Sequence, residues 1–294
     1  MNATAQKIST QIQDIHTVVK ALDRSTKESL KQLELNNYPQ VVPVIEAIAT
    51  GTPENVLPQS DAAKFVANLP SIQKNQSRIE KIYQNTRIKT RHMAIDLLSD
   101  EQVKFCRQRN NIKARMDLYR ECGIPLAERV ARDAISKVAC LDEIGLIVFV
   151  SSTGFVAPGV DAELIKRLGL KRNTARVTIN FMGCAAAMNG LRAAADYIRA
   201  YPTKKALVVC LELSSINAVY EDNLNDVIIH SIFGDGCAAV VLGGCDRNMA
   251  RGSGKIAITK HLSYLIEDTE DGITLGIEDN GITCKLSRDL PNYI

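Results

Sequence analysis

The stretch RVTINFMGCAAAMNGLRAAADYIRA, from Arg176 to Ala200, predicts a strand, a tight turn and a helix, with Cys184 at the join. Apolar and polar residues alternate in RVTINF, which is typical of a strand. From Ala185 onward the stretch is rich in alanine and leucine, and its apolar residues recur at helical spacing. Gly183 lies in the predicted turn. A cysteine is therefore expected where a strand passes into a helix.

The position of Cys184 indicates a reactive thiol. Unpaired backbone N–H groups and the macrodipole at a helix start favour a thiolate, which is the nucleophilic form of cysteine. The alternative is a buried structural cysteine, which is the commoner state of a cysteine taken at random. Position alone does not decide between the two.

The composition is that of an ordinary globular protein. With 294 residues, 46% of them hydrophobic, the chain can bury a large core as one domain or as two packed halves. Its net charge of +3 favours neither a nucleic-acid partner nor a membrane surface. No apolar run reaches membrane-spanning length and MNATAQKIST has no signal-peptide core, so a cytoplasmic protein is expected. The eight cysteines form no CxxC pair and are expected to be reduced, and neither metal-ligand spacing nor a P-loop occurs.

Several other segments predict buried strands. IGLIVFV, at 144–150, is a continuous apolar run, as expected for a strand covered on both faces. VVPVIEAIATG, at 41–51, ends at a glycine, and shorter apolar runs lie at 207–210 and 238–242. Strands interleaved with helices predict an α/β sheet layered with helices. SSTGFVAPG follows the 144–150 run at the carboxyl end of the strand, where open α/β sheets place their sites.

The motifs FMGCAAAMNGLRAAADYI, KKALVVCLELSSINAVY and SIFGDGCAAVVLGG together resemble the type III polyketide synthases, the chalcone synthase-like enzymes of the thiolase superfamily. Upstream, IATGTPENVLPQSDAAKF, RIKTRHM and SSTGFVAPGVDAELIKRLGL extend the resemblance, which covers about residues 41 to 294. Each motif alone is weak, but their common order and spacing are specific. Another condensing enzyme of the same fold, a priming ketoacyl synthase or hydroxymethylglutaryl-CoA synthase, is the alternative that GFVAPG, GCAAA and FGDGCAA disfavour.

The resemblance implies the thiolase-like α/β fold, with α/β/α/β/α layers built from two similar halves. Residues 41–245 would form the N-terminal half, which carries the nucleophile, and residues 246–294 would begin the C-terminal half. Residues 1–40 lie outside the resemblance and are expected to form an N-terminal helical extension; a linker or a dimer-contact helix remains open. In this fold Cys184 would lie near the centre of the molecule, at the inner end of a tunnel.

At the mouth of that tunnel the family holds the phosphates of coenzyme A with basic residues. By alignment the resemblance implies Arg78 and Lys81 for this role, since charge-assisted hydrogen bonds recognise phosphate. Asn85 stands at the third basic position and departs from the pattern. The segment from Lys74 to Arg115 has eleven Lys or Arg against four acidic residues, which is also typical of a solvated helical face.

The resemblance also implies the residues of the acyl pocket. Ser152 and Thr153 correspond to small hydroxyl residues of the initiation pocket, although loop hydroxyls also bond their own backbone. Asn217 stands at a pocket-lining position, with a solvent-facing loop residue as the alternative, and Cys284 stands at an aromatic gate, which would alter the width of the cavity. Phe233 corresponds to a phenylalanine that orients malonyl in catalysis, and core packing is its alternative.

These correspondences imply an acyltransferase with no permanently bound cofactor and with coenzyme A thioesters as substrates. Its partners would be acyl-CoA, malonyl-CoA and a second copy of the chain in a homodimer, with no nucleic acid and no membrane. Cys184 would accept the acyl group, because exchange between thioesters keeps that group activated. Malonyl-CoA would then extend it by decarboxylative condensation, which requires hydrogen-bond donors at the enolate oxygen.

In the family those donors are a histidine followed by PGG and an asparagine. None of the histidines of this chain, His16, His92, His230 and His261, is followed by PGG, and the motif would come after Ile294. The chain by itself is therefore expected not to condense, and a fragment that pairs with a full-length subunit as a structural partner is the alternative from another class. His230 is expected to be a hydrogen-bonded structural histidine.

Overall fold

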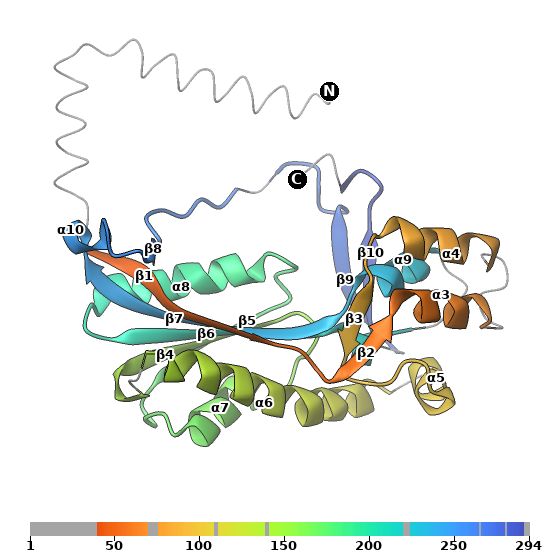
Figure 1. Ribbon diagram of the computed structural model, residues 1–294, viewed down its shortest axis with the longest axis horizontal. Helices are drawn as coiled ribbons and strands as arrows, with labels where there is room; N and C mark the ends of the chain where they lie inside the picture. The colour runs from red at the N-terminus through yellow and green to blue at the C-terminus, as the bar shows by residue number, and fades with distance from the viewer. Residues whose placement is uncertain are drawn as a thin grey trace, which may run out of the picture.

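The computed structural model describes residues 40–69, 76–108, 111–138, 141–219, 224–264, 266–279 and 281–290. The predicted N-terminal helical extension, residues 1–40, lies outside the described residues apart from its last position. Figure 1 shows the arrangement of helices and strands along the rest of the chain.

A mixed six-stranded sheet, in the order β5-β4-β6-β7-β1-β8, forms the body of the protein. Its strands in chain order are β1 (Val41–Gly51), β4 (Ile144–Ser151), β5 (Ala175–Asn180), β6 (Lys205–Leu213), β7 (Asp235–Asp246) and β8 (Ile256–Ala257). β4 pairs in parallel with both β5 and β6, whereas β7 pairs antiparallel with β6 and β1. The carboxyl ends of the three parallel strands therefore lie at the same end of the sheet, where α/β folds place their sites.

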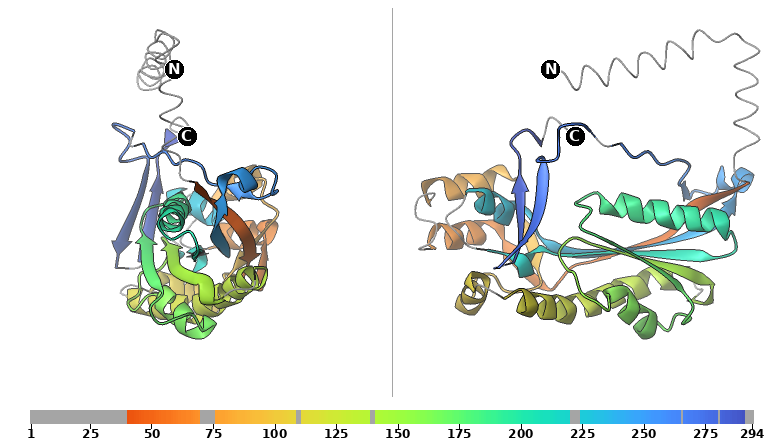
Figure 2. Two further views of the ribbon diagram at one scale, coloured as in Figure 1. Left: turned by 90° about the vertical axis from the view of Figure 1, so that its left-hand side faces the viewer. Right: turned by 180° about the vertical axis from the view of Figure 1, so that it is seen from behind.

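Helices cover both faces of this sheet (Figures 1 and 2). α6 (Ile112–Ser136) and α7 (Val160–Leu168) lie on one face, and α8 (Ala186–Ala200) lies on the other. Two clusters of buried apolar side chains fill the interfaces between the sheet and the helices on its two faces. This explains why β4 is apolar at nearly every position. Gly190 permits a close approach of α8, because a Cβ at this position would lie 2.9 Å from a methyl carbon of Val150.

The smaller elements gather at the two ends of the sheet (Figure 1). At the end with the carboxyl termini of the parallel strands lie the ribbon β2 (Asn55–Pro58) and β3 (Thr90–Met93), the hairpin β9 (Ile273–Glu278) and β10 (Gly281–Leu286), and the helices α3 (Gln59–Ala67), α4 (Gln76–Asn85), α5 (Asp100–Arg107) and α9 (Leu224–Ile232). The short turns η2 (Leu141–Glu143) and η3 (Ser214–Asn217) flank β4 and β6, and α10 (Arg247–Ala250) lies beside β8.

The α/β class predicted from the sequence is confirmed. Among the described residues one large sheet lies between two helical layers, and the two further sheets have two strands each. The boundary predicted at residue 245 stays a prediction, although β8, beyond this boundary, pairs with β1 of the same large sheet. The basic segment that begins at Lys74 does not form one helical face: its described residues are divided among α4, β3, α5 and the start of α6, and Arg91 and Arg115 are buried.

Arg115 is a fully buried cation that joins three segments near the site. Its guanidinium donates to the side-chain oxygen of Asn111 at 2.8 Å and to the carbonyl oxygen of Cys106, at the end of α5, at 3.0 Å. It also donates to the carbonyl oxygens of Ile216 and Ala218, on both sides of Asn217. α5, α6 and η3 are thereby held together by one side chain, whose buried charge is tolerated because these oxygens surround it.

Arg115→Ala is expected to lower the free energy of unfolding by about 3 kcal/mol or more, because each buried oxygen left without its donor costs about 1–3 kcal/mol. Lys113→Ala, on the same helix, removes only an exposed ion pair with Asp117 and is expected to leave stability nearly unchanged. Urea unfolding followed by circular dichroism compares the two. Equal midpoints for both variants would contradict the anchoring role of Arg115.

Candidate active site

The chain reverses between β5 and α8 through an elbow, residues 181–185, that presents Cys184. Phe181 and Gly183 both have left-handed backbone angles, with φ of 54° and 74°. α8 begins at Ala186, after an N-cap at Ala185, so Cys184 lies in the turn before the helix and not in its first turn. The predicted order of strand, turn and helix is confirmed, and the expected helix start at Ala185 is wrong by one residue.

Phe181 holds this conformation although it is not a glycine. A left-handed angle at such a residue costs on the order of 1–3 kcal/mol, which the surroundings must offset. The ring of Phe181 packs edge-on against Phe155, with centroids 5.8 Å apart and an interplanar angle of 62°. Since Phe155 belongs to the loop after β4, this contact joins the elbow to the loop that carries Ser152 and Thr153.

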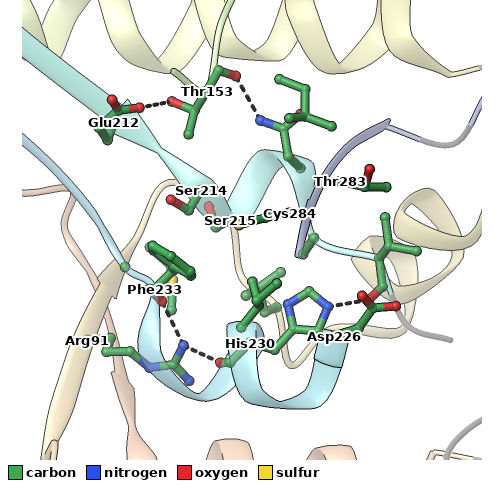
Figure 3. A pocket seen from close by; sticks show the side chains of 18 of the residues that line it. Arg91, Thr153, Glu212, Ser214, Ser215, Asp226, His230, Phe233, Thr283 and Cys284 are labelled. Carbon is green, nitrogen blue, oxygen red and sulfur yellow. Dashed lines mark hydrogen bonds between the residues drawn. The ribbon is translucent and has the colours of Figure 1, made fainter. Parts of the chain in front are cut away.

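A cavity of about 470 Å³ lies at the end of the sheet where the parallel strands have their carboxyl ends. Figure 3 shows part of its lining from close by. Six of the predicted site residues line it: Ser152, Thr153, Cys184, Asn217, Phe233 and Cys284. Cys184 is exposed, so in this chain its sulfur does not lie at the buried inner end of a tunnel as the resemblance implied. The other two predicted residues, Arg78 and Lys81, are exposed on α4 and do not line the cavity.

Thr153 is fixed on one wall of the cavity by three hydrogen bonds. Its hydroxyl donates to the carboxylate of Glu212 at 2.6 Å and accepts from the backbone N–H of Leu213 at 2.9 Å. Its carbonyl oxygen accepts from Nδ2 of Asn217 at 2.7 Å (Figure 3). Asn217 is itself buried, so it is not a solvent-facing loop residue.

Glu212 is a cavity residue that the sequence analysis missed. Besides Thr153, the backbone N–H of Ser152 donates to its carboxylate at 2.8 Å. Burial raises the pKa of Glu212, and the hydrogen bonds from Thr153 and Ser152 oppose that rise. An acidic residue inside the apolar run LVVCLEL was the available signal, because a carboxylate is seldom placed in a buried strand without partners.

Phe233 is held at the opposite wall by Arg91, which the sequence analysis also missed as a site residue. The buried guanidinium of Arg91 donates to the carbonyl oxygen of Phe233 at 2.8 Å, to that of His230 and to Oε1 of Gln59 at 2.9 Å (Figure 3). Phe233 itself is half-buried. The short turn between α9 and β7 is thus fixed from the side of β3.

Behind this wall Asp235 fixes the start of η3. Its carboxylate accepts from the backbone N–H of Ser215 at 2.9 Å, from that of Ala94 at 2.6 Å, and from the Ser215 hydroxyl. Burial raises the pKa of Asp235, and these hydrogen bonds oppose the rise. The aspartate of the FGDG motif therefore joins β3, η3 and β7 and does not face the cavity.

His230 lines the cavity on α9, and its Nε2 lies against the carbonyl oxygen of Val219. Loss of solvent around the ring lowers its pKa to about 4, and the charges of Arg91 and Arg115 act in the same direction. The ring is therefore neutral near pH 7, with Nε2 as the donor to the Val219 oxygen. This arrangement is that of a hydrogen-bonded structural histidine.

Cys284 faces the cavity from the half-buried strand β10. Asn225 of α9 holds the strand just after this residue: its Nδ2 donates to the Cys284 carbonyl oxygen at 2.7 Å, and its Oδ1 accepts from the N–H of Leu286 at 3.3 Å. Burial raises the pKa of the Cys284 thiol, and negative charge on Cys184 raises it further. The two thiols therefore face one cavity.

No group of three or more His, Cys, Asp or Glu residues in the described part of the chain could hold a metal ion. Nor does any helix in the described ranges have the length and apolar character to cross a bilayer.

Comparison with known proteins gives consistent similarities. The sequence profile of the chalcone and stilbene synthases, N-terminal domain, matches residues 36–246. The alpha-pyrone synthesis polyketide synthase-like Pks18 of Mycobacterium tuberculosis is 50% identical over 257 residues, which are 87% of this chain and 65% of that protein. A 1,3,6,8-tetrahydroxynaphthalene synthase of Streptomyces peucetius is 28% identical over 256 residues, 85% of this chain and 65% of that protein. The chain thus spans about 65% of the length of these curated relatives.

Solved structures are similar over the same region. PKS-I of the brown alga Ectocarpus siliculosus has a TM-score of 0.82 and 42% identity, over 88% of this chain and 70% of that chain. The C-terminal type III polyketide synthase domain of Steely1 from Dictyostelium has a TM-score of 0.78 and 26% identity, over 86% and 70%. These similarities confirm the resemblance found in the sequence and the predicted thiolase-like fold class.

The lowered pKa of His230 predicts a pH-dependent stability. Because the unfolded imidazole binds a proton at higher pH than the folded one, the free energy of unfolding falls as the pH drops below about 6.5. Between about pH 7.5 and pH 5 this group is expected to contribute a loss of about 2 kcal/mol, which His230→Gln removes.

Urea unfolding at the two pH values measures the effect. Gln84→Asn, an exposed change outside the cavity lining, is the control and should keep the full pH dependence of the wild type. If the His230 variant shows the same pH dependence as the wild type, the neutral state of His230 is wrong.

Proposed function

Because the chain belongs to the chalcone and stilbene synthase family, we propose that Cys184 is the nucleophile of a type III polyketide synthase and accepts an acyl group from a coenzyme A thioester. The observation that carries the proposal is that the elbow brings Cys184 to the same cavity as five other predicted pocket residues. The relatives are polyketide synthases, which are enzymes, and no permanently bound cofactor enters the proposal.

The first step is an exchange of thioesters. The Cys184 thiolate attacks the acyl carbonyl carbon, the bond to the coenzyme A sulfur breaks, and the coenzyme A thiol leaves. The exposure of Cys184 supports this step, since a carrier thioester can reach the sulfur without a rearrangement of the core. Thr153 and Asn217, fixed to each other and to Glu212, would set the shape of the acyl pocket beside the sulfur.

The second step is extension by malonyl-CoA, which loses carbon dioxide to form an enolate that attacks the Cys184 thioester. Phe233 is proposed to orient the malonyl group, and its support is the turn that Arg91 holds. We do not assign the enolate donor to His230, because its Nε2 is engaged by the Val219 oxygen.

Arg78 and Lys81 are proposed to hold the phosphates of coenzyme A. Both lie exposed on α4, the helix that contributes Tyr83 to the cavity lining, so they are near the cavity and accessible to a charged carrier. Phosphate groups are recognised by charge-assisted hydrogen bonds from such side chains. Asn85, also on α4, is exposed as well and offers an amide at a position where the family has a basic residue.

We propose that the chain forms a homodimer through the exposed edge strand of the large sheet. β5 is the edge strand, and nearly all its residues are exposed, among them Val177 at 37%. Met182 and Met188, on the elbow and α8, are exposed at 56% and 60%. An unpaired apolar edge is a template for pairing with another strand, and a second copy of β5 would satisfy it.

The seven described cysteines are all free thiols, which suits a reducing compartment such as the cytoplasm.

Cys184 is expected to carry the acyl group when the protein is incubated with an acyl-CoA such as hexanoyl-CoA. Mass mapping of proteolytic peptides should locate the added acyl mass on Cys184, and Cys184→Ala should remove it. Cys122→Ala, at a half-buried thiol outside the cavity, should acylate like the wild type. Acylation that survives in the Cys184 variant would falsify the assignment.

Cys284 is expected to widen the cavity for long aliphatic acyl groups, because an aromatic side chain there would fill space that methylene groups can occupy. Cys284→Phe should reduce loading of Cys184 by a long-chain acyl-CoA about tenfold relative to a short one, since each buried methylene is worth about 0.8 kcal/mol. Competition between hexanoyl-CoA and lauroyl-CoA measures the ratio, with Cys284→Ala as the control that should keep the wild-type preference. An unchanged ratio in the Phe variant would show that this position does not set the size.

A further inference from the structure

Two thiols face the cavity from different parts of the chain. Of the seven described cysteines only Cys184 and Cys284 line it, whereas Cys106 and Cys237 are buried in the core and the remaining three are half-buried elsewhere. Cys184 is exposed and Cys284 is half-buried. An oxidant in solution can therefore reach Cys184, and Cys284 is the less exposed thiol of the same cavity.

Both thiols stand on well-held backbone. The elbow with left-handed angles at Phe181 and Gly183 presents Cys184. Asn225 binds the Cys284 carbonyl oxygen and the N–H of Leu286, and at the start of this strand Gly281 packs so closely on Arg115 that a Cβ there would lie 3.2 Å from its Nε. Burial raises the pKa of the Cys284 thiol, and negative charge on Cys184 raises it further. The fold thus brings the two thiols to one cavity from segments that are far apart in the sequence.

We propose that Cys284 is the resolving thiol of Cys184, so that oxidation by hydrogen peroxide joins the two residues in a reversible disulfide across the cavity. In the first step the Cys184 thiolate attacks one oxygen of the peroxide, the O–O bond breaks and hydroxide leaves, which gives a sulfenic acid. In the second step the Cys284 sulfur attacks the sulfenic sulfur, the S–O bond breaks and the hydroxide takes the thiol proton to form water. Two thiols lose two electrons in total, and one peroxide becomes two waters.

The bridge would have two consequences. It would keep Cys184 from further oxidation to the sulfinic and sulfonic acids, which thiols do not reverse. It would also block acyl transfer, a consequence that rests on the proposed function, whereas formation of the bridge does not. Cys184 is the more exposed of the two thiols and is therefore the one that peroxide from solution meets first.

The experiment treats the full 294-residue chain with a small molar excess of hydrogen peroxide, alkylates the remaining thiols and maps peptides without reduction. The expected result is a linked pair of peptides that contain Cys184 and Cys284, which dithiothreitol separates. In Cys284→Ser, dimedone should trap a sulfenic acid on Cys184, and the fraction of Cys184 that dithiothreitol recovers after peroxide should fall about fivefold or more. Cys122→Ser should behave like the wild type, and circular dichroism establishes that each variant is folded.

The outcomes separate clearly. Equal loss of recoverable Cys184 in the wild type and in Cys284→Ser would overturn the proposal, as would a bridge from Cys184 to any other cysteine or to a second copy of the chain. Because peptide mapping needs no acyl-CoA, a bridge without acylation would contradict only the proposed function. Acylation without a bridge would contradict only the resolving role of Cys284.

Discussion

The reversal of the chain between Asn180 and Ala186 is the constraint on which the site depends. β5 runs parallel to β4, and α8 must return across the same sheet so closely that only a glycine fits at position 190. The few residues between them make this turn with two left-handed backbone angles, one at a glycine and one at Phe181. The aromatic contact with Phe155 stabilises that angle and aligns the loop after β4 with the elbow. The nucleophile and the hydroxyl residues are therefore placed by one geometric requirement.

Around this elbow the cavity is held by buried polar residues, each surrounded by partners from distant segments. Arg115 binds carbonyl oxygens of α5 and of the η3 region, Asp235 binds backbone N–H groups of two segments, and Glu212 binds Thr153 and Ser152. Such groups cost several kcal/mol if a partner is lost, so they fix one arrangement of the loops more sharply than apolar contacts can. The loops around the cavity are thereby joined to the sheet and to one another.

The sequence allowed the α/β class, the strand at 144–150 and the elbow to be predicted, because local periodicity reports these features directly. It also led, through the resemblance, to the pocket residues that the structure brings together around Cys184. Glu212, Arg91 and Arg115 were missed as supports, since their partners lie far away in the sequence. Gln59, for example, joins Arg91 on one side and donates to the carbonyl oxygen of Ser231 on the other, 172 residues away. A pattern read within a short window can single out a buried charge such as Glu212, but it does not identify the distant partners.

The pairing of β1 has a consequence for synthesis on the ribosome. β1 is the first strand of the sheet to be made, and among the described strands its neighbours are β7 and β8. Val41 lies opposite Asp246, so about 200 further residues must be translated before the register of β1 can be completed. At bacterial or eukaryotic elongation rates this takes on the order of 10–40 seconds, during which an apolar strand has no partner. The large sheet can therefore be completed only after β7 has been synthesised.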